Sequence, residues 1–301
     1  MNAFTSSTIP RRARLFSGAR LAAACALAGS ALLAACGGGG SGHPAVTGVT
    51  ASPVQYSRTM TVTVSGRDLA QDQGIRMETV GGCGEVFPID TRSDDTRQFT
   101  CSIESLGPMQ VRILDVATGE ELASLFDEVE IPQVEVSATQ GTWSGKFVVE
   151  LDPVAAPIST KNFLNYVNAG FYRNTLFHRV IEGFVIQAGG FTAGPVVKVP
   201  TRDPVPLESA NGLRNLRGTL AMARGPEADS GNAQWYVNLV DNASLDYVDE
   251  TKPGYAVFGR VVSGLDAVDK IGAVPVKADA ASGLTHLPET NVVITSASQV
   301  R

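Results

Sequence analysis

The spacing of apolar and polar positions divides the chain into two regions with different hydrophobic patterns. Between Pro44 and about Val134, short stretches alternate, as in Thr61-Val62-Thr63-Val64 and Val111-Arg112-Ile113-Leu114. Turn signals separate these stretches at Ser65-Gly66, Gly81-Gly82 and Thr118-Gly119. An alternation of period two is typical of strands that bury one face. The pattern therefore predicts a small β-sandwich over residues 44–134.

The second region, from about Gln140, predicts longer elements and two helices. Residues 143–151 alternate as a strand does, and prolines at 153 and 157 interrupt the pattern. Residues 159–170 predict a short amphipathic helix, with a hydroxyl cap in front, Phe163 and Val167 on one face, and a glycine at its exit. Residues 265–271 predict a second helix, because apolar residues recur there at helical spacing. Further apolar strands are predicted at 177–191, 218–223, 234–240 and 255–262.

Composition and charge narrow the class of protein. The chain has 301 residues with 44% hydrophobic content, which is enough for two domains with their own cores. Its formal net charge is -6, and the four arginines before residue 36 leave the remainder near -10, from 20 basic and 30 acidic side chains. An acidic chain of this kind predicts no nucleic-acid partner.

The N-terminal segment reads as an export signal. A basic start precedes the uncharged stretch LAAACALAGSALLAA at 21–35, which is too short to span a bilayer. A twin-arginine signal at Arg11-Arg12 is the alternative to a plain basic start. Leu33-Ala34-Ala35-Cys36 resembles a bacterial lipobox, which implies a signal peptide over 1–35, lipidation of Cys36 and a glycine-rich tether over 36–43. With glycine after Cys36, the resemblance favours an outer-membrane anchor facing the periplasm of a bacterial cell envelope.

Two cysteines remain once Cys25 is removed with the signal and Cys36 is acylated. An oxidising compartment favours a disulfide between Cys83 and Cys101. A metal or redox pair is the alternative, although no second cysteine or histidine lies close to either residue in the sequence. The sequence thus predicts no metal site and no cofactor.

The apolar run FHRVIEGFVIQAGGF at 177–191 contains a charged residue, Arg179. Taken alone, the arginine is most simply explained by an ion pair with Glu182 or another surface acid. Gln187 follows eight positions later and shares the arginine's face if the run is one strand without a bulge. His178 then points the opposite way, into the core, and is predicted to be structural.

Four long stretches together are similar to bacterial cyclophilins. They are KNFLNYVNAGFYRNTLFHRVIEGFVIQAGGF at 161–191, ESANGLRNLRGTLAMAR at 208–224, AQWYVNLVDN at 233–242 and YAVFGRVVSGLDAVDKI at 255–271. The resemblance covers roughly 136–298, and we expect the domain to span 136–301. It implies a closed eight-stranded antiparallel barrel capped by two helices, with peptidyl-prolyl cis/trans isomerase activity and no cofactor. In the first region, residues 49–69 resemble the opening strands of immunoglobulin-like IPT/TIG modules, so the chain is expected to be all-β with an immunoglobulin-like spacer or docking domain.

The resemblance also implies roles for particular residues. Arg179 matches the catalytic arginine, and Gln187 the glutamine that holds the substrate carbonyl and orients the arginine. An apolar socket for the proline ring is implied at Phe184, Val185, Tyr236, Leu245 and Tyr255. Gln234 and the backbone of Ala223-Arg224 match the groove for residues that precede the proline. The expected substrates are therefore proline-containing unfolded or exported polypeptides.

Some positions depart from the family pattern. Val185 stands where methionine is usual, Tyr236 where phenylalanine is, and Tyr255 where eukaryotic members carry histidine. Ser244 occupies the position of a tryptophan that contacts cyclosporin in eukaryotic members, which predicts weak cyclosporin binding with activity retained. The alternative function is a lipid-tethered module that binds proline-containing segments, or acts as a scaffold, with little turnover.

Overall fold

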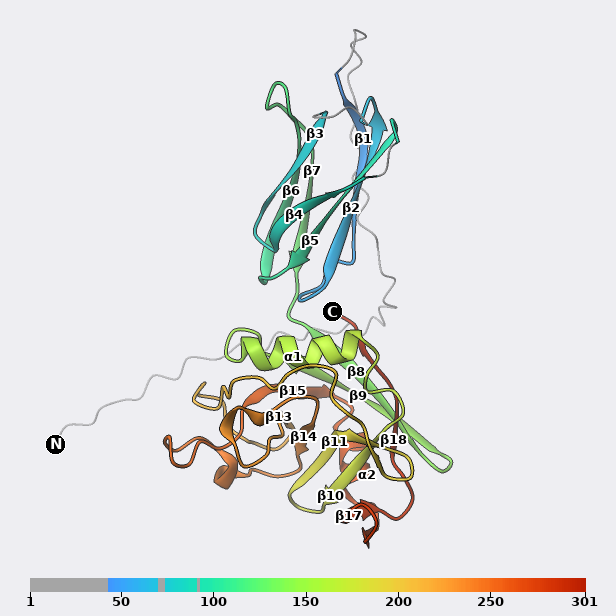
Figure 1. Ribbon diagram of the computed structural model, residues 1–301, viewed down its shortest axis with the longest axis vertical. Coiled ribbons are helices and arrows are strands. Elements are labelled where there is room, and N and C mark those ends of the chain that lie inside the picture. Colours follow the sequence, from blue (N-terminus) through green and yellow to red (C-terminus); the bar gives the residue numbers. More distant parts are fainter. Residues whose placement is uncertain (1–42, 70–73, 91–92) are drawn as a thin grey trace, which may run out of the picture.

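The computed structural model of the protein describes residues 43–69, 74–90 and 93–301. The expected signal peptide, Cys36 and all of the tether but residue 43 lie outside this part. Two bodies follow one another along the long axis, one built from β1–β7 and the other from β8–β18 with two helices (Figure 1). Within the described ranges, no helix is both long and apolar enough to cross a membrane.

The first body is a sandwich of two antiparallel sheets. One sheet has the order β1-β2-β5-β4, formed by Ala45–Ser52, Thr59–Arg67, Thr96–Ile103 and Cys83–Ile89. The other has the order β3-β6-β7, formed by Ile75–Val80, Gly107–Asp115 and Glu121–Val129. In chain order these are the ABED and CFG sheets of a constant-type immunoglobulin domain. The expected immunoglobulin-like arrangement is present.

The alternation in β2 builds the core of this sandwich. Met60, Val62 and Val64 point inward and are fully buried, as the period of two predicts. The turn predicted at Ser65-Gly66 was wrong, because both residues continue β2. Gly66 meets another requirement: a Cβ there would lie 2.0 Å from the carbonyl oxygen of Ala45. The glycine thus allows β1 to approach closely, beside a break in the register of the β1–β2 pair.

Cys83 and Cys101 form the disulfide that cysteine counting favoured. Cys83 begins β4 and Cys101 lies in the adjacent strand β5, so the bond links two neighbouring strands of one sheet. Cys101 is buried in the core of the sandwich. The bond closes a loop with a sequence separation of 18 residues, for which the chain-entropy account gives a stabilisation of about 3 kcal/mol.

The second body is a closed antiparallel barrel. Its strands follow the ring order β10-β18-β8-β9-β15-β13-β14-β11, and the pairing of β10 with β11 closes the ring at eight strands. The short β12, Val196–Val197, adds to the outside of β11. A small hairpin of β16, Val276–Asp279, and β17, Leu284–Pro288, forms a separate sheet. The ring itself comprises Gln133–Gln140 (β8), Trp143–Leu151 (β9), Thr175–Ile181 (β10), Val185–Thr192 (β11), Thr219–Met222 (β13), Trp235–Asn238 (β14), Val257–Ser263 (β15) and Val293–Gln299 (β18).

The apolar run at 177–191 is a hairpin rather than the single strand expected from its composition. Its two arms, β10 and β11, turn at Glu182-Gly183-Phe184, and Gly183 has a φ of 65°. Arg179 and Gln187 are therefore partners directly across the hairpin. They share a face because facing residues of paired strands point the same way, not because eight positions separate them along one strand.

Helix α1, Pro157–Asn168, covers the end of the barrel that faces the sandwich (Figure 1). Phe163 and Val167 are buried, as its amphipathic pattern predicts. The predicted hydroxyl cap was wrong, because the helix begins two residues earlier and makes no side-chain cap of its own. Glu208, from a distant loop, accepts hydrogen bonds from the N–H groups of Ile158 and Ser159 at 2.9 and 2.6 Å. A carboxylate at this end is also favoured by the helix dipole.

Helix α2, Leu265–Gly272, begins after Gly264, which has a φ of 77°. A Cβ at Gly264 would lie 2.3 Å from the carbonyl oxygen of Lys146, so glycine is required both by conformation and by space. Val268 and Ile271 are buried. The helix packs on β9, β10 and β11 and thereby holds the strands that carry Arg179 and Gln187.

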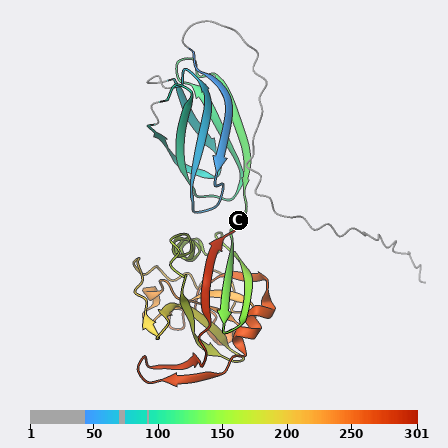
Figure 2. The same cartoon turned by 90° about the vertical axis from the view of Figure 1, so that its right-hand side faces the viewer.

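The last strand of the barrel reaches the sandwich. Figure 2 shows β18 running toward the junction, where the C-terminus lies. Gln299, at its end, is buried and donates from Nε2 to the carbonyl oxygen of Tyr56 in the sandwich at 3.0 Å. Its Oε1 accepts from Asn168 of α1 at 3.1 Å. This side chain therefore links the two bodies.

Candidate functional site

A cavity of about 290 Å³ on the barrel brings together residues from separate segments. It collects nine of the ten residues expected to contact substrate or catalyse its conversion: Arg179, Phe184, Val185, Gln187, Ala223, Arg224, Tyr236, Leu245 and Tyr255. The tenth, Gln234, does not line the cavity but contacts Gln187. Strands β10, β11 and β14 carry four of the nine, Phe184 lies in the β10–β11 turn, Ala223 and Arg224 directly follow β13, and the 243–255 loop supplies the last two.

Arg179 and Gln187 form the polar wall of the cavity, and with Gln234, which contacts Gln187 beside it, they make a polar row of three side chains. Nη1 of Arg179 donates to Oε1 of Gln187 at 3.3 Å, and Nε2 of Gln187 donates to Oε1 of Gln234 at 3.0 Å. The pairing of the strands explains this row. Gln187 of β11 faces Arg179 of β10 on one side and Tyr236 of β14, two residues from Gln234, on the other. Gln187 is held from both ends, so its amide can fix the guanidinium in one orientation.

Arg179 has no carboxylate partner among residues 43–69, 74–90 and 93–301, and the ion pair with Glu182 that its sequence context suggested is not formed. Its guanidinium carbon lies 5.8 Å from the centre of the Phe184 ring. The charge is therefore positioned by an amide and an aromatic face. Its other N–H groups donate to none of the described residues, so they can address a bound molecule.

The apolar wall is a small cluster separate from the main barrel core. Val185, Ala221, Tyr236 and Val257 are its buried members. Phe184, Leu213, Ala223, Leu245 and Tyr255 are half-buried and pack against them. The rings of Tyr236 and Tyr255 meet edge to face, with centroids 5.8 Å apart. The result is an apolar hollow beside a fixed cation. Leu213 packs against this cluster without lining the cavity of Arg179, and it was not predicted from the sequence.

Arg224 forms the rim of the cavity. Its Nε donates to the carbonyl oxygen of Gly254 at 3.0 Å and its Nη1 to that of Gly225 at 3.0 Å. The guanidinium carbon lies 4.8 Å from the centre of the Tyr255 ring. With a further bond from Nη1 to the carbonyl oxygen of Pro226 at 3.3 Å, this arginine is held by three backbone carbonyls and an aromatic face, so it shapes the rim.

His178 lies next to Arg179 in β10, where the register of the β10–β11 pair shifts between Phe177 and Arg179. The side chain is buried, and its ring lies 4.7 Å from that of Phe191. Burial, with a smaller contribution from the nearby charge of Arg179, lowers the pKa of His178 from its usual 6.5 to about 4. The ring is therefore neutral at pH 7, which agrees with a structural role.

The pH dependence of stability is expected to reveal this histidine. The folded pKa lies below the unfolded one, so the unfolded chain binds the proton more readily between pH 6.5 and about 4. The contribution of neutral His178 to the free energy of unfolding is thus fully present above pH 6.5. Up to about 3 kcal/mol of that free energy is lost as the pH falls through this window. Urea unfolding of the wild type and of His178→Gln at pH 7 and pH 4.5 measures it. Equal slopes with pH in the two proteins would contradict the expectation.

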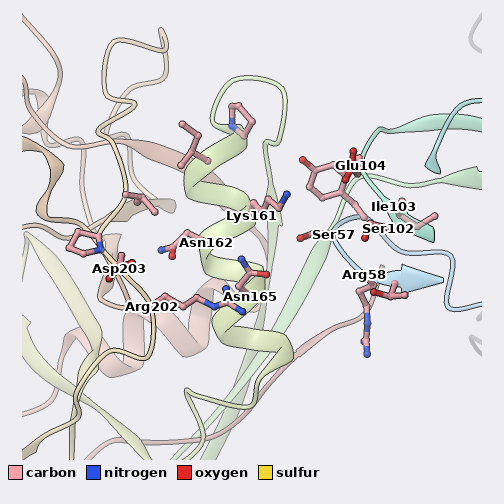
Figure 3. Close-up of a pocket in the computed structure, with 16 residues that line it drawn as sticks. Ser57, Arg58, Ser102, Ile103, Glu104, Lys161, Asn162, Asn165, Arg202 and Asp203 are labelled. Carbon is pink, nitrogen blue, oxygen red and sulfur yellow. The ribbon is translucent and has the colours of Figure 1, made fainter. Parts of the chain in front are cut away.

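A wider groove of about 800 Å³ lies between the sandwich and α1 (Figure 3). Ser57 and Glu104 line it from the sandwich, and Lys161 and Asn165 line it from the helix. Its walls carry both cations and carboxylates, and they include none of the ten predicted site residues. The smaller cavity, with its oriented cation and apolar hollow, is the better candidate for chemistry.

That cavity suits a compact apolar ring whose adjoining group accepts a hydrogen bond. The residues that line it include no serine, threonine, cysteine, lysine or histidine, so no side chain there is an obvious nucleophile. What the geometry offers is one oriented donor, Arg179, aimed beside the hollow.

Comparisons with known proteins identify the family of the barrel. The family described as "Cyclophilin type peptidyl-prolyl cis-trans isomerase/CLD" matches residues 134–299. The chain is 46% identical over 160 residues to peptidyl-prolyl cis-trans isomerase A of Dickeya dadantii (strain 3937), covering 53% of this chain and 82% of that protein. It is 46% identical over 155 residues to peptidyl-prolyl cis-trans isomerase B of Escherichia coli (strain K12), covering 50% and 92%. A solved cyclophilin type isomerase of Cryptosporidium parvum matches with 22% identity and a TM-score of 0.45, over 57% of this chain and 99% of that one.

Proposed function

This chain belongs to the cyclophilin-type peptidyl-prolyl cis-trans isomerases, and we propose that Arg179 is the group through which its barrel accelerates rotation about X-Pro bonds. The observation that carries the proposal is the oriented guanidinium, which lies beside an apolar hollow and forms no ion pair with a carboxylate of the described residues. Arg179→Ala tests the proposal, because it should slow conversion of an Ala-Pro peptide while the barrel stays folded.

The reaction needs a donor that acts only partway through the rotation. Resonance between the nitrogen lone pair and the carbonyl gives the peptide bond a rotation barrier of about 18–20 kcal/mol. X-Pro bonds populate both isomers, so folding of a protein chain is delayed when such a bond starts in the non-native isomer. When the bond twists, the lone pair leaves conjugation and the prolyl nitrogen can accept a hydrogen bond. A donor aimed at this nitrogen stabilises the transition state more than either planar isomer.

In the proposed complex the proline ring occupies the hollow formed by Phe184, Val185, Tyr236, Leu245 and Tyr255. This places the prolyl nitrogen near Arg179, whose planar guanidinium stays charged and offers several donors. Gln187 orients the arginine through Oε1. Its Nε2 carries two hydrogens, of which one bonds Gln234 and the other is proposed to donate to the substrate carbonyl. Ala223, Arg224 and Gln234 are proposed to receive residues that precede the proline.

We further propose that the physiological substrates are exported proteins with slow proline-limited folding steps. Uncatalysed X-Pro isomerisation takes about tens to hundreds of seconds, long enough to delay folding. Support for an envelope location comes from the export pattern at 1–35, the lipobox ending at Cys36 and the disulfide in the sandwich. The proposed protein is a lipoprotein on the periplasmic side of the outer membrane, with the sandwich as spacer or docking domain.

The anchor is tested by Cys36→Ser in a bacterial host. The variant is expected to leave the membrane fraction, because a serine cannot form the thioether that carries the lipid. Isomerase activity per molecule should be unchanged, since the barrel is not altered. Fractionation of outer and inner membranes, with the wild type as control, provides the measurement. Equal membrane retention of both proteins would contradict lipidation at Cys36.

Cyclosporin is expected to inhibit weakly. Ser244, beside Leu245, offers neither the aromatic face nor the indole N–H of the tryptophan that the resemblance places there in eukaryotic members. Activity on peptide is expected to remain, because Ser244 does not line the cavity of Arg179. Titration of the wild type and of Ser244→Trp by calorimetry tests this. A submicromolar complex of the wild type would overturn the expectation.

A further inference from the structure

Three buried asparagines lie behind the apolar wall of the cavity. Asn215, Asn238 and Asn242 are exposed by only 1%, 0% and 7%, and none of them lines the cavity. A buried amide is costly unless its donors and its acceptor are paired. The partners of these three side chains therefore show what the asparagines hold in place.

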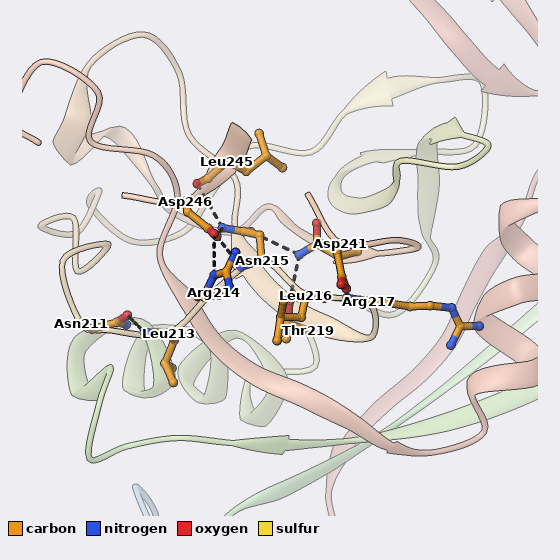
Figure 4. A network of polar contacts seen from close by, with 11 residues as sticks. Asn211, Leu213, Arg214, Asn215, Leu216, Arg217, Thr219, Asp241, Leu245 and Asp246 are labelled. Carbon is orange, nitrogen blue, oxygen red and sulfur yellow. Dashed lines mark hydrogen bonds and ion pairs between the residues drawn. The ribbon is translucent and has the colours of Figure 1, made fainter. Parts of the chain in front are cut away.

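Asn215 connects three walls of the proposed proline socket. Its Nδ2 donates to the carbonyl oxygen of Leu245 at 3.0 Å (Figure 4), and the same oxygen accepts from the N–H of Tyr255 at 3.0 Å. Its Oδ1 accepts from the hydroxyl of Tyr236 at 2.8 Å. One side chain thus joins strand β14 to the loop residues on the other side of the hollow.

The backbone of Asn215 fastens the same loop. Its N–H donates to Oδ1 of Asp246 at 2.6 Å, and its carbonyl oxygen accepts from the N–H of Asn242 at 2.7 Å. Asp246 also pairs with Arg214 at 3.1 Å. Burial alone would raise the pKa of Asp246, but the hydrogen bonds from Asn215 and Arg214 outweigh it and lower the pKa below its usual value. The carboxylate is therefore charged where the loop needs an acceptor.

The other two asparagines extend the layer to the remaining wall. Nδ2 of Asn242 donates to the carbonyl oxygen of Phe184 at 3.0 Å and to Oδ1 of Asn238 at 2.7 Å. Nδ2 of Asn238 donates to Oδ1 of Asn215 at 3.2 Å. The layer is continuous, and it connects Phe184 to Asn215 without touching the polar row of Arg179.

We propose that Asn215 is a positioning residue for the proline socket: it fixes Tyr236, Leu245 and Tyr255 relative to one another and so sets how tightly the ring of an X-Pro substrate binds. This rests on the proposed role of the cavity. Asn215 contacts none of the three side chains in the polar row. Its loss should therefore weaken binding of the ground state and the transition state alike, which raises KM and leaves kcat nearly unchanged.

Initial rates of Ala-Pro peptide conversion over a range of concentrations test the proposal. Asn215→Ala is expected to raise KM about tenfold, because Tyr236 and the loop lose a shared buried partner. Tyr236→Phe, added to Asn215→Ala, should lower KM again, because it removes the hydroxyl that the first substitution leaves unpaired. Asn215→Ser is measured beside the alanine variant as a milder change with the same expected direction.

Gln299→Ala is the matched control, since Gln299 is a buried amide whose partners lie at the junction with the sandwich. It should lower the free energy of unfolding without moving KM. Three results would overturn the inference if the wild type is active. They are an unchanged KM in both Asn215 variants, a fall in kcat as large as the rise in KM, or no fall in KM when Tyr236→Phe is added to Asn215→Ala. A wild type that does not convert the peptide would overturn the proposed function as well.

Discussion

Arg179→Ala is expected to lower kcat/KM for conversion of an Ala-Pro peptide by about 10²–10³-fold, the loss typical of removing one oriented donor from a transition state. The barrel should stay folded, because the side chain is half-exposed and forms no ion pair with any described residue. A protease-coupled or NMR exchange assay measures the rate. Far-UV and near-UV circular dichroism report the fold.

Two further variants sharpen this result. Arg179→Lys keeps the charge but loses the planar set of donors, so about a tenfold loss or more is expected. Arg260→Ala is the control, because Arg260 pairs with Glu150 at 2.9 Å and does not line the cavity. Its activity should match that of the wild type. If wild type and Arg179→Ala convert the peptide equally, the catalytic assignment is wrong.

Phe163→Ala is expected to lower the free energy of unfolding by about 3–5 kcal/mol, as large truncations in a closed core do. The ring of Phe163 is 1% exposed and packs against Trp235 and Phe258, with centroids 5.8 and 5.4 Å away. Removing it leaves a cavity where α1 closes the barrel. Urea unfolding followed by tryptophan fluorescence measures the change.

A residue on the same helix provides the control for that prediction. Ile158 is 41% exposed, and Ile158→Ala should cost far less than Phe163→Ala. Activity per folded molecule should be retained in both variants, because neither residue touches the cavity of Arg179. A loss below about 1 kcal/mol for Phe163→Ala would show that α1 does not close the core as described.

Periodicity located elements well wherever one face of an element is buried. The strand expected at 143–151 is β9 with the same bounds, and the helix expected at 265–271 is α2 with one residue added. Both have one apolar face and clear signals at their ends. The run at 177–191 was misjudged because both arms of the hairpin are apolar, and its turn contains only Glu182-Gly183 as a signal between them.

Pairings between distant segments could not be predicted from local pattern. Glu208 stabilises the start of α1 from about 50 positions away, so the search for a neighbouring hydroxyl cap found the wrong residue. Nothing in the local sequence sets Asn215, Asn238 and Asn242 apart, and only the closed barrel brings them into one layer. The residues of the cavity were predicted from the family resemblance and not from the composition.

The central claim is that Arg179 acts on the twisted X-Pro bond and not on substrate binding as such. NMR exchange on a saturating Ala-Pro peptide separates the two, because it reports both the dissociation constant and the rate of isomerisation on the protein. Arg179→Ala should bind the peptide within about threefold of the wild type while on-protein exchange slows by about 10²-fold or more. Unchanged exchange in the variant, or a loss of binding as large as the loss of rate, would contradict the account.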